Sequence, residues 1–436
     1  MGLAVRSSDG IALKCLSLLQ GLLADFRPRD FAIRLWDGSE WGPEPGQLAR
    51  FTLVIRAPGV VRTMFLAADE LSLGEAFIYG DLDIEGDIGC AFALGDRLIR
   101  GKGTAADRLR WAKQLFSLPG GGRPRDPRRR PKVGSRLHSI SRDRESVTYH
   151  YDVSNDFYAL WLDRRMVYSC GYFATPGDGL DDAQERKLDY LCRKLRLRPG
   201  ERLLDIGCGW GGLIIHAAEH YGVEGTGITL SRPQAELANE RIRRAGLSDY
   251  CRVEVRDYRE MGDTAVFDKI ASVGMFEHVG AFRLREYFRR AFRLLRPGGV
   301  FVNHGIASNP SYPPPPGPSF CDHYVFPDGE LYPLGATLQA AEEAGFEVRD
   351  VESLREHYVL TLRHWRRRME ERSDEARRIA GETIFRTWRL YLAGAAHTFS
   401  EGKNNVYQTL LSRPDGGRTG LPLTREDWYR RDPRSC

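Results

Sequence analysis

The residues best suited to chemistry are an aspartate and a group of glycines at positions 205–212. Residues 202–206 (RLLDI) are mostly apolar, residues 207–212 (GCGWGG) contain four glycines, and residues 213–218 are again mainly apolar. This order predicts a strand, a tight loop and a helix, which form the first unit of a doubly wound α/β fold. Glycines allow backbone N–H groups to approach a ligand, and a helix start adds the positive end of its dipole. We therefore expect a ligand with an adenosine or phosphate group at this loop.

The glycine spacing alone leaves several ligands open. Gly207, Gly209 and Gly212 also fit the G-x-G-x-x-G spacing of dinucleotide sites, which place an acid about 20 residues further on. The next predicted strand, residues 225–231, ends without an acid, and no Gly-Lys-Ser/Thr follows the glycines, so a dinucleotide site and a P-loop are disfavoured. Asp205 before the glycines gives a D-x-G-x-G form that resembles the S-adenosylmethionine site of class I methyltransferases. A tight turn that binds nothing is the remaining alternative.

Composition places limits on the class of protein. A length of 436 residues predicts two domains, and a net charge of +5 gives no reason to expect nucleic-acid binding. The eight cysteines contain no C-x-x-C pair, which argues against a zinc site and a disulfide framework and favours a reducing cytosol. No apolar run reaches the ~18 residues of a membrane span. We expect a cytoplasmic protein without a metal ion.

The chain divides into three predicted regions. Residues 1–116 predict a small α+β domain, which could bind lipid, dimerise or be purely structural. Residues 117–138 form a linker rich in proline, glycine and arginine, and residues 139–436 form the catalytic domain. The linker contains a basic cluster: Arg123, Arg125, Arg128, Arg129, Arg130 and Lys132. It is either a solvated linker or a segment attracted to anionic phospholipid headgroups.

Two aromatic segments before the glycine loop carry a family resemblance. Residues 150–163 (HYDVSNDFYALWLD), in which Ser154 is a suitable helix N-cap, and residues 166–173 (MVYSCGYF) resemble the cyclopropane fatty acid synthase family. That family includes the mycolic acid cyclopropane synthases. Further segments match in order: 227–231 (GITLS) with Gln234, 257–259 (DYR), 272–280 (SVGMFEHVG), 296–299 (RPGG), 326–329 (FPDG) and 357–362 (HYVLTL). The resemblance is strong over residues 139–413 and looser over 71–85. It implies a Rossmann-like class I methyltransferase domain behind a smaller N-terminal domain.

The resemblance also implies a reaction. A cis alkene in a phospholipid acyl chain takes the methyl group of S-adenosylmethionine, and the resulting carbocation loses a proton from the new methyl group and closes a cyclopropane ring. Such chemistry requires an aligned methyl donor, a water-free cavity and a base that does not trap the cation. In this family the base is a bound bicarbonate.

The resemblance implies which residues hold the two small molecules. The bicarbonate site corresponds to Cys170, Glu277, His304, Ile306 and Tyr358. For S-adenosylmethionine, Tyr168 and Ser169 correspond to the carboxylate end, and Asp205 with Gly207, Gly209 and Gly211 to the methionine and ribose. Thr229, Leu230 and Gln234 fall near the ribose and adenine, with Tyr258 beside the ring. Taken singly, a histidine such as His304 is more often a buried core residue, and Cys170 among aromatics is often only a small apolar one. The aromatic rings of Tyr151, Phe173 and Phe276 are candidates to stabilise the cation.

Other functions stay open at this point. Loss of a different proton from the same cation gives a methylene-branched chain, and the sequence does not separate the two products. A small-molecule N- or O-methyltransferase and a lipid-binding protein without activity are further alternatives. Residues 309–320 (NPSYPPPPGPSF) contain six prolines and predict a lid or the rim of an acyl channel. We expect helices over 354–372 and 382–399, a loosely held tail over 413–436, peripheral attachment to a membrane surface, and a homodimer.

Overall fold

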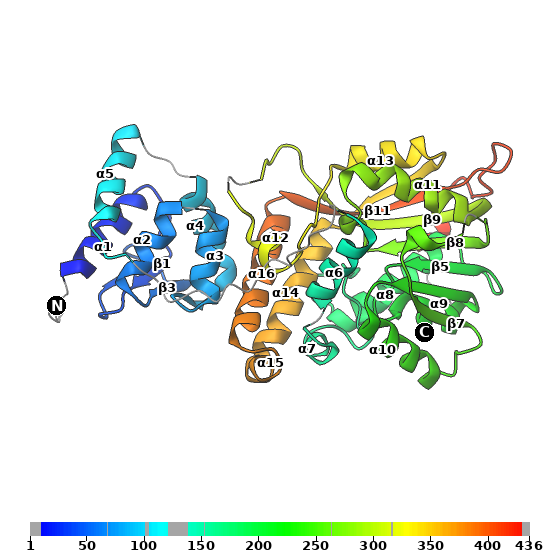
Figure 1. The fold of residues 1–436 in the computed structure, drawn as a ribbon, viewed down its shortest axis with the longest axis horizontal. Helices are drawn as coiled ribbons and strands as arrows, with labels where there is room; N and C mark the ends of the chain where they lie inside the picture. The colour runs from blue at the N-terminus through cyan, green and yellow to red at the C-terminus, as the bar shows by residue number, and fades with distance from the viewer. Residues whose placement is uncertain are drawn as a thin grey trace. The chain divides into compact units, whose positions relative to one another are not determined.

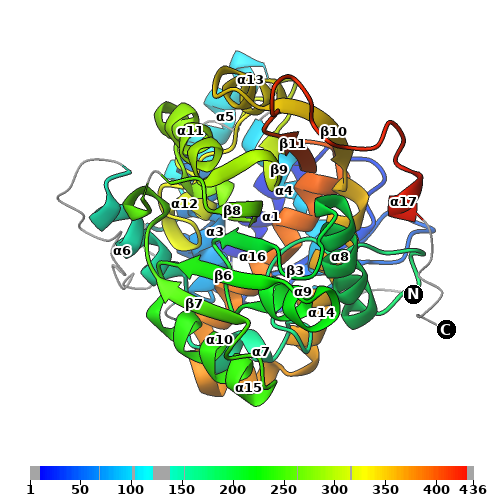
Figure 2. The same ribbon diagram turned by 90° about the vertical axis from the view of Figure 1, so that its right-hand side faces the viewer.

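The predicted strand at 202–206 is an interior strand of a seven-stranded sheet. In the computed structural model, which describes residues 10–67, 69–100, 104–120, 138–151, 153–262, 264–314 and 317–429, the strand order is β10-β11-β9-β8-β5-β6-β7 (Figure 2). The strands are β5 (Arg202–Ile206), β6 (Glu224–Thr229), β7 (Cys251–Val255), β8 (Phe267–Val273), β9 (Leu295–Ser308), β10 (Glu347–Ser353) and β11 (Asn404–Ser412). Strands β5 to β9 pair in parallel, and β11 is antiparallel to β9 and β10. The predicted doubly wound fold is confirmed.

The chain order of these strands fixes where a ligand binds. From β5 the chain continues to β6 and β7 on one side, and then returns to β8 and β9 on the other. In such open sheets the ligand crevice lies at the carboxyl ends of the strands where the order reverses. The carboxyl end of β5 is followed directly by Gly207.

Helices cover both faces of this sheet. Helices α8 (Leu180–Leu195) and α9 (Gly212–Tyr221) pack on Leu203 of β5, whereas α11 (Leu284–Leu294) and α13 (Leu334–Glu343) pack on its neighbour Leu204. Side chains of a strand alternate between its two faces, so Asp205 lies on the same face as Leu203, beneath α8. Helix α10 (Arg232–Arg244) packs beside α9 through Ala235 and Ala238.

The contacts divide the chain into two units that do not follow chain order. One unit contains residues 1–130, 313–327 and 373–397, and the other contains residues 131–312, 328–372 and 398–436. The predicted division at 116 and 139 therefore differs from the contacts, which place two later segments with the N-terminal residues. The predicted basic cluster of the linker lies outside the described residues.

The N-terminal unit is an α+β structure, as predicted. Its four-stranded sheet has the order β2-β1-β3-β4. Figure 1 labels β1 and β3 of this sheet. The strands are β1 (Phe31–Arg34), β2 (Glu40–Trp41), β3 (Phe51–Ile55) and β4 (Leu82–Gly86), and the helices are α1 (Gly10–Leu22), α2 (Pro58–Ala67), α3 (Glu70–Ile78), α4 (Ile88–Arg100) and α5 (Ala105–Phe116). Phe320 of α12 (Phe320–Tyr324) and Ala393 of α16 (Glu382–Ser400) are buried in its core, which explains why these late segments belong to it.

Local expectations have mixed outcomes. Ser154 caps α7 (Asn155–Ala159), because its hydroxyl oxygen accepts the Phe157 N–H at 3.3 Å. The predicted helices at 354–372 and 382–399 are confirmed as α14 (Arg355–Glu371) and α16. Over the described part of 309–319 the chain forms no helix or strand. None of the helices in the described ranges is long and apolar enough to cross a bilayer.

The expectation of a loose tail is wrong for residues 425–429. Helix α17 (Glu426–Tyr429) packs on α8, and the Trp428 side chain is buried. The Arg193 guanidinium donates to the Trp428 carbonyl at 2.8 Å, and Arg425 pairs with Asp350 at 2.7 Å. A single buried tryptophan in an otherwise polar segment therefore attaches this end of the chain.

A buried arginine ties α16 to the N-terminal sheet, and its removal tests this part of the fold. The Arg386 guanidinium donates to the carbonyls of Phe77 at 2.7 Å and Leu82 at 2.8 Å. Arg386→Ala leaves both carbonyls without this donor, so we expect the free energy of unfolding in urea to fall by about 3 kcal/mol. Arg378→Ala is the control, because that side chain is 73% exposed. Equal urea midpoints for the two variants would contradict this role.

Candidate active site

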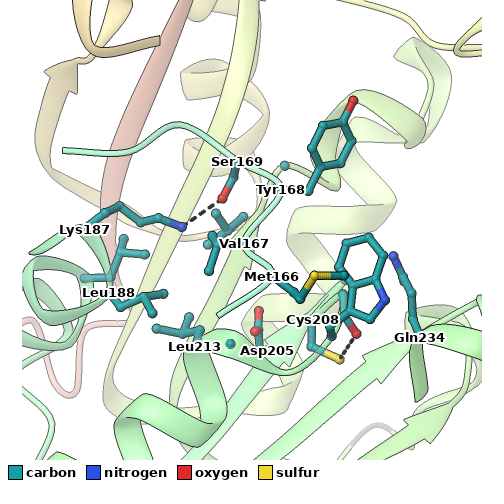
Figure 3. Close-up of a pocket in the computed structure, with 17 residues that line it drawn as sticks. Met166, Val167, Tyr168, Ser169, Lys187, Leu188, Asp205, Cys208, Leu213 and Gln234 are labelled. Carbon is teal, nitrogen blue, oxygen red and sulfur yellow. Dashed lines mark hydrogen bonds between the residues drawn. The ribbon is translucent and has the colours of Figure 1, made fainter. Parts of the chain in front are cut away.

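A pocket opens at the carboxyl end of β5. It is lined by Met166, Val167, Tyr168, Ser169, Lys187, Leu188, Leu191, Asp205, Gly207, Cys208, Gly209, Trp210, Gly212, Leu213, Gln234, Val273 and Gly274 (Figure 3). A second pocket shares Gly207, Gly209, Gln234 and Gly274 with the first, and continues past Thr229, Leu230 and Tyr258. The two pockets therefore adjoin at the glycine loop and are treated together as one cavity. Nine of the ten predicted cofactor residues line it.

The tenth, Gly211, packs elsewhere. Its φ is +78°, and a Cβ at this position would lie 3.3 Å from the Cβ of Ala238 on α10. Gly211 therefore allows the turn into α9 and the close approach of α10. Gly207 has a different constraint, since its own Cβ would lie 2.5 Å from that of Met275. The N–H groups of Gly207 and Cys208 both donate to the Ile228 carbonyl, so these two amides hold the loop to β6 and are not directed at a ligand.

Asp205 is a buried carboxyl group in the pocket whose charged form is disfavoured by burial. Its side chain is 3% exposed, and Oδ1 has no hydrogen-bond partner among the described residues. Burial raises the pKa of Asp205 to about 7, although nearby Lys187 acts in the opposite direction. A buried carboxylate oxygen without a donor is suited to a cationic N–H group. The ammonium group of S-adenosylmethionine fits this requirement.

Helix α8 holds the segment opposite Asp205. The Lys187 ammonium donates to Ser169 Oγ at 2.8 Å, and the Gln184 amide donates to the Ser169 carbonyl at 2.8 Å. Sequence reasoning missed both α8 residues. They occupy helical spacing with the apolar positions Leu180, Leu188 and Leu191, so polar types at core positions were the available signal.

The part of the cavity that is predicted to hold the adenosine is held by contacts between nearby residues. The Thr229 hydroxyl donates to Gln234 Oε1 at 2.8 Å, and Ser231 caps α10. Tyr258 is buried, its ring meets that of Tyr287 edge to face at 5.5 Å, and its hydroxyl has no partner in the described part of the chain. Burial raises the pKa of Tyr258, so its hydroxyl remains a neutral hydrogen-bonding group.

Three of the five predicted bicarbonate residues meet at the end of β9. Glu277 lies in the short helix η2 (Phe276–His278), and its Oε1 accepts the Ile306 N–H at 2.7 Å. Burial raises the pKa of Glu277 to about 7, and its Oε2 has no partner among the residues that the structure describes. His304 precedes Ile306 by two residues and so lies on the same face of β9.

His304 is held in its neutral form, and its Nδ1 faces the Gln408 amide. The Gln408 amide nitrogen lies 3.2 Å from His304 Nδ1, and a donated N–H there leaves the ring proton on Nε2. Nε2 is buried without a partner in the described ranges, and burial lowers the pKa of His304 well below its usual value. Glu277 and His304 do not line either of the two pockets described above. A carboxylate acceptor and an N–H donor are the two groups that would complement a small anion carrying one O–H.

Cys170 and Tyr358 connect to this group through Leu354. The Cys170 thiol lies 3.7 Å from the Leu354 carbonyl, which also accepts the Tyr358 N–H at 3.0 Å. The Leu354 N–H donates to Val406, which is paired with Ile306 across β11 and β9. Burial raises the pKa of Cys170, so the thiol stays neutral and suits a wall of the site better than a nucleophile.

The suggestion that Phe276 stabilises a cation is wrong. Its ring packs against Tyr287 and Phe288 of α11, in the core on the opposite face of the sheet from Leu203. Gly305, which alternates with His304, faces this ring, and a Cβ there would lie 2.9 Å from Phe276 Cδ1. The side chain of Tyr151 lies outside what the structure describes.

Comparison with known proteins identifies the family. Residues 138–409 match the family model described as mycolic acid cyclopropane synthetase. The chain belongs to this family. A relative from Pseudomonas putida, named "Probable fatty acid methyltransferase", is 42% identical over 404 residues, which cover 91% of this chain and 96% of the relative. The cyclopropane-fatty-acyl-phospholipid synthase of Escherichia coli K12 is 36% identical over 299 residues, covering 67% of this chain and 74% of that protein.

Solved structures agree with the family. The structure of mycolic acid cyclopropane synthase CmaA1 complexed with SAH and CTAB is 33% identical, with a TM-score of 0.58 over 62% of this chain and 97% of that one. Coclaurine N-methyltransferase, at 22% identity and a TM-score of 0.55, shares the fold alone. The predicted family, the predicted fold and the assignment to S-adenosylmethionine-dependent methyltransferases are confirmed.

The raised pKa of Asp205 predicts that cofactor binding depends on pH. Below pH 7 the carboxyl group of the free protein is largely protonated and neutral, and it then loses its attraction for the cofactor ammonium. We expect the affinity for S-adenosylmethionine, measured by calorimetry, to fall about fivefold to tenfold between pH 7 and pH 6.

Two variants separate Asp205 from the second buried acid. Asp205→Asn binds the cofactor weakly and without this pH dependence, whereas Glu277→Gln retains the wild-type dependence. An affinity of the wild-type protein that does not change between pH 6 and pH 8 would contradict the role of Asp205.

Proposed function

We propose that this protein transfers a methylene group from S-adenosylmethionine to a cis double bond of an unsaturated phospholipid acyl chain and forms a cyclopropane ring. The observation that carries the proposal is the pair of unpartnered buried atoms, Glu277 Oε2 and His304 Nε2, in a chain whose cofactor pocket lies at the ends of the same strands. A methyl transfer to an amine or hydroxyl does not require this pair. The Escherichia coli relative carries the corresponding name.

The cofactor and the base have separate tasks in this proposal. Bound S-adenosylmethionine supplies the methyl group, and bound bicarbonate accepts the proton that the new methyl group loses as the ring closes. Glu277 Oε2 accepts the O–H of the anion, and the His304 Nε2–H donates to one of its oxygens. Ile306 holds Glu277 in place through its N–H, which is bonded at 2.7 Å. The Tyr358 hydroxyl donates a hydrogen bond to the anion, and Cys170 forms part of the apolar wall of the site.

The proposed base site requires an ionised Glu277. With its pKa raised to about 7, this carboxyl group is charged above neutrality and accepts the bicarbonate O–H there. His304 stays neutral over the same range, because burial disfavours its charged form. The two residues therefore hold a base beside the reacting carbons without themselves forming a strong nucleophile.

A second candidate product rests on a specific observation. The Pseudomonas putida relative covers more of this chain at a higher identity than the Escherichia coli synthase, and its name specifies a fatty acid methyltransferase. If a hydride first shifts from the methyl-bearing carbon to the neighbouring cationic carbon, loss of a proton from the methyl group gives a methylene-branched chain instead of a ring. Both products gain one CH2, so mass alone does not separate them.

Because the proposed substrate is a phospholipid acyl chain, we expect the protein to act at a membrane surface. We infer cytoplasmic, peripheral association, helped by the basic cluster of the linker, and the homodimer also stays a prediction. Binding to anionic vesicles that does not weaken with added salt would contradict the role of the basic cluster.

Replacement of the acid that holds the base tests the proposal. Glu277→Gln removes the acceptor for the bicarbonate O–H while keeping the side-chain shape. With vesicles of cis-unsaturated phospholipid, we expect mass spectrometry to show the gain of one CH2 per chain slowed by about 10²- to 10⁴-fold, with cofactor affinity retained.

The matched control is Glu356→Gln on α14, whose side chain is 86% exposed. It should turn over at the wild-type rate. Full turnover by Glu277→Gln would remove the bicarbonate-base proposal, and no CH2 gain by the wild-type protein, with cofactor binding intact, would favour a small-molecule substrate.

A further inference from the structure

Lys187 is a buried cation in the cofactor pocket that the predicted site residues do not include. Lys187 lies on α8 and is 1% exposed. It lines the pocket together with Ser169 and Asp205. Figure 3 shows its side chain extended towards Ser169, with Asp205 lower in the view, beside Leu213. Burial of a lysine is costly, and here it lowers the pKa of Lys187 to about 8. A buried lysine at this position therefore requires an interaction that offsets the cost of burial.

The hydrogen bond to Ser169 has a defined direction. An ammonium group only donates, so Ser169 Oγ accepts at 2.8 Å, and the hydroxyl proton of Ser169 must point elsewhere. Gln184 fixes the backbone of the same residue through the Ser169 carbonyl. Lys187 and Gln184 thus leave the Ser169 hydroxyl as a donor towards the pocket.

The charges around Lys187 fit the amino-acid end of the cofactor. The groups that act on its charge are Asp163, Cys170 and Asp205. Asp163 already accepts the N–H groups of Arg165 and Val167 at 2.8 and 2.7 Å, and Cys170 is neutral. Asp205 has a free oxygen that suits the cofactor ammonium. Among the residues that line the first pocket, Lys187 is then the cation that can offset the cofactor carboxylate.

We propose that Lys187 is a positioning residue for the methionine carboxylate of S-adenosylmethionine, which it holds through the oriented Ser169 hydroxyl and through its own positive charge. The inference rests on the proposed assignment of this pocket to the amino-acid end of the cofactor. It adds a second charge to the recognition by Asp205, so that the ammonium and the carboxylate each meet an opposite charge.

Two probes that differ only at the amino-acid end test the proposal. S-adenosylhomocysteine carries the ammonium and carboxylate, and 5′-methylthioadenosine lacks both. For Lys187→Met we expect the affinity for S-adenosylhomocysteine, measured by calorimetry, to fall about 10- to 100-fold, with the affinity for 5′-methylthioadenosine unchanged. Lys187→Gln, which keeps a donor but no charge, should show the same selective loss and replaces the apolar variant if that variant does not fold.

Lys194→Met is the matched control. Lys194 lies on the same helix and is equally buried, but its ammonium pairs with Glu352. This variant should bind both probes as the wild type does. Ser169→Ala combined with Lys187→Met should lose less than the sum of the two single losses, because Lys187 acts partly through Ser169.

The outcomes separate the role of Lys187 from the site assignment. Equal weakening of both probes by Lys187→Met would indicate general damage to the pocket and overturn the proposal. Loss of S-adenosylhomocysteine affinity in Asp205→Asn but not in Lys187→Met would overturn the role of Lys187 and leave the cofactor site in place. Unchanged affinity in both variants would overturn the cofactor site itself.

Discussion

The alternation of side chains along parallel strands places the chemical groups of this protein. On β5, Leu203 and Asp205 face α8, and Leu204 and Ile206 face the opposite helices. On β9, Val302 packs on the α8 side, so His304 and Ile306 lie on that side as well. A shift of either strand by one residue would turn Asp205 or His304 into the other core. The cofactor end and the base end of the site therefore depend on the same register.

Burial of charge is the cost of this arrangement. Asp205, Glu277 and Lys187 all lie within the protein, and in each case burial is the largest influence on the pKa. Without ligands these groups have incomplete partners, which disfavours the folded state. Bound ligands of opposite charge supply the missing interactions. We expect such a site to favour binding at the expense of the stability of the free protein.

Sequence reasoning succeeded for features that are encoded by residues adjacent in the chain. The strand, loop and helix around Gly207, the Ser154 cap and the family were all predicted, because each is encoded by adjacent residues. Gln184 and Lys187 were missed, since a polar residue on an amphipathic helix gives no sign of which strand end it faces. The grouping of 313–327 and 373–397 with the N-terminal residues was missed for a related reason: apolar side chains such as Phe320 and Ala393 do not show which core they enter. Phe276 was misplaced because its ring and its neighbour Glu277 leave η2 in different directions.

The structure of the lipid product tests the central claim most directly. After incubation of the protein with S-adenosylmethionine and vesicles of cis-unsaturated phospholipid, NMR of the extracted acyl chains distinguishes a ring from a branch. The account predicts cyclopropane methylene signals together with loss of the cis-alkene protons. A methylene-branched chain, with its terminal alkene protons, would contradict ring closure while retaining methyl transfer to lipid.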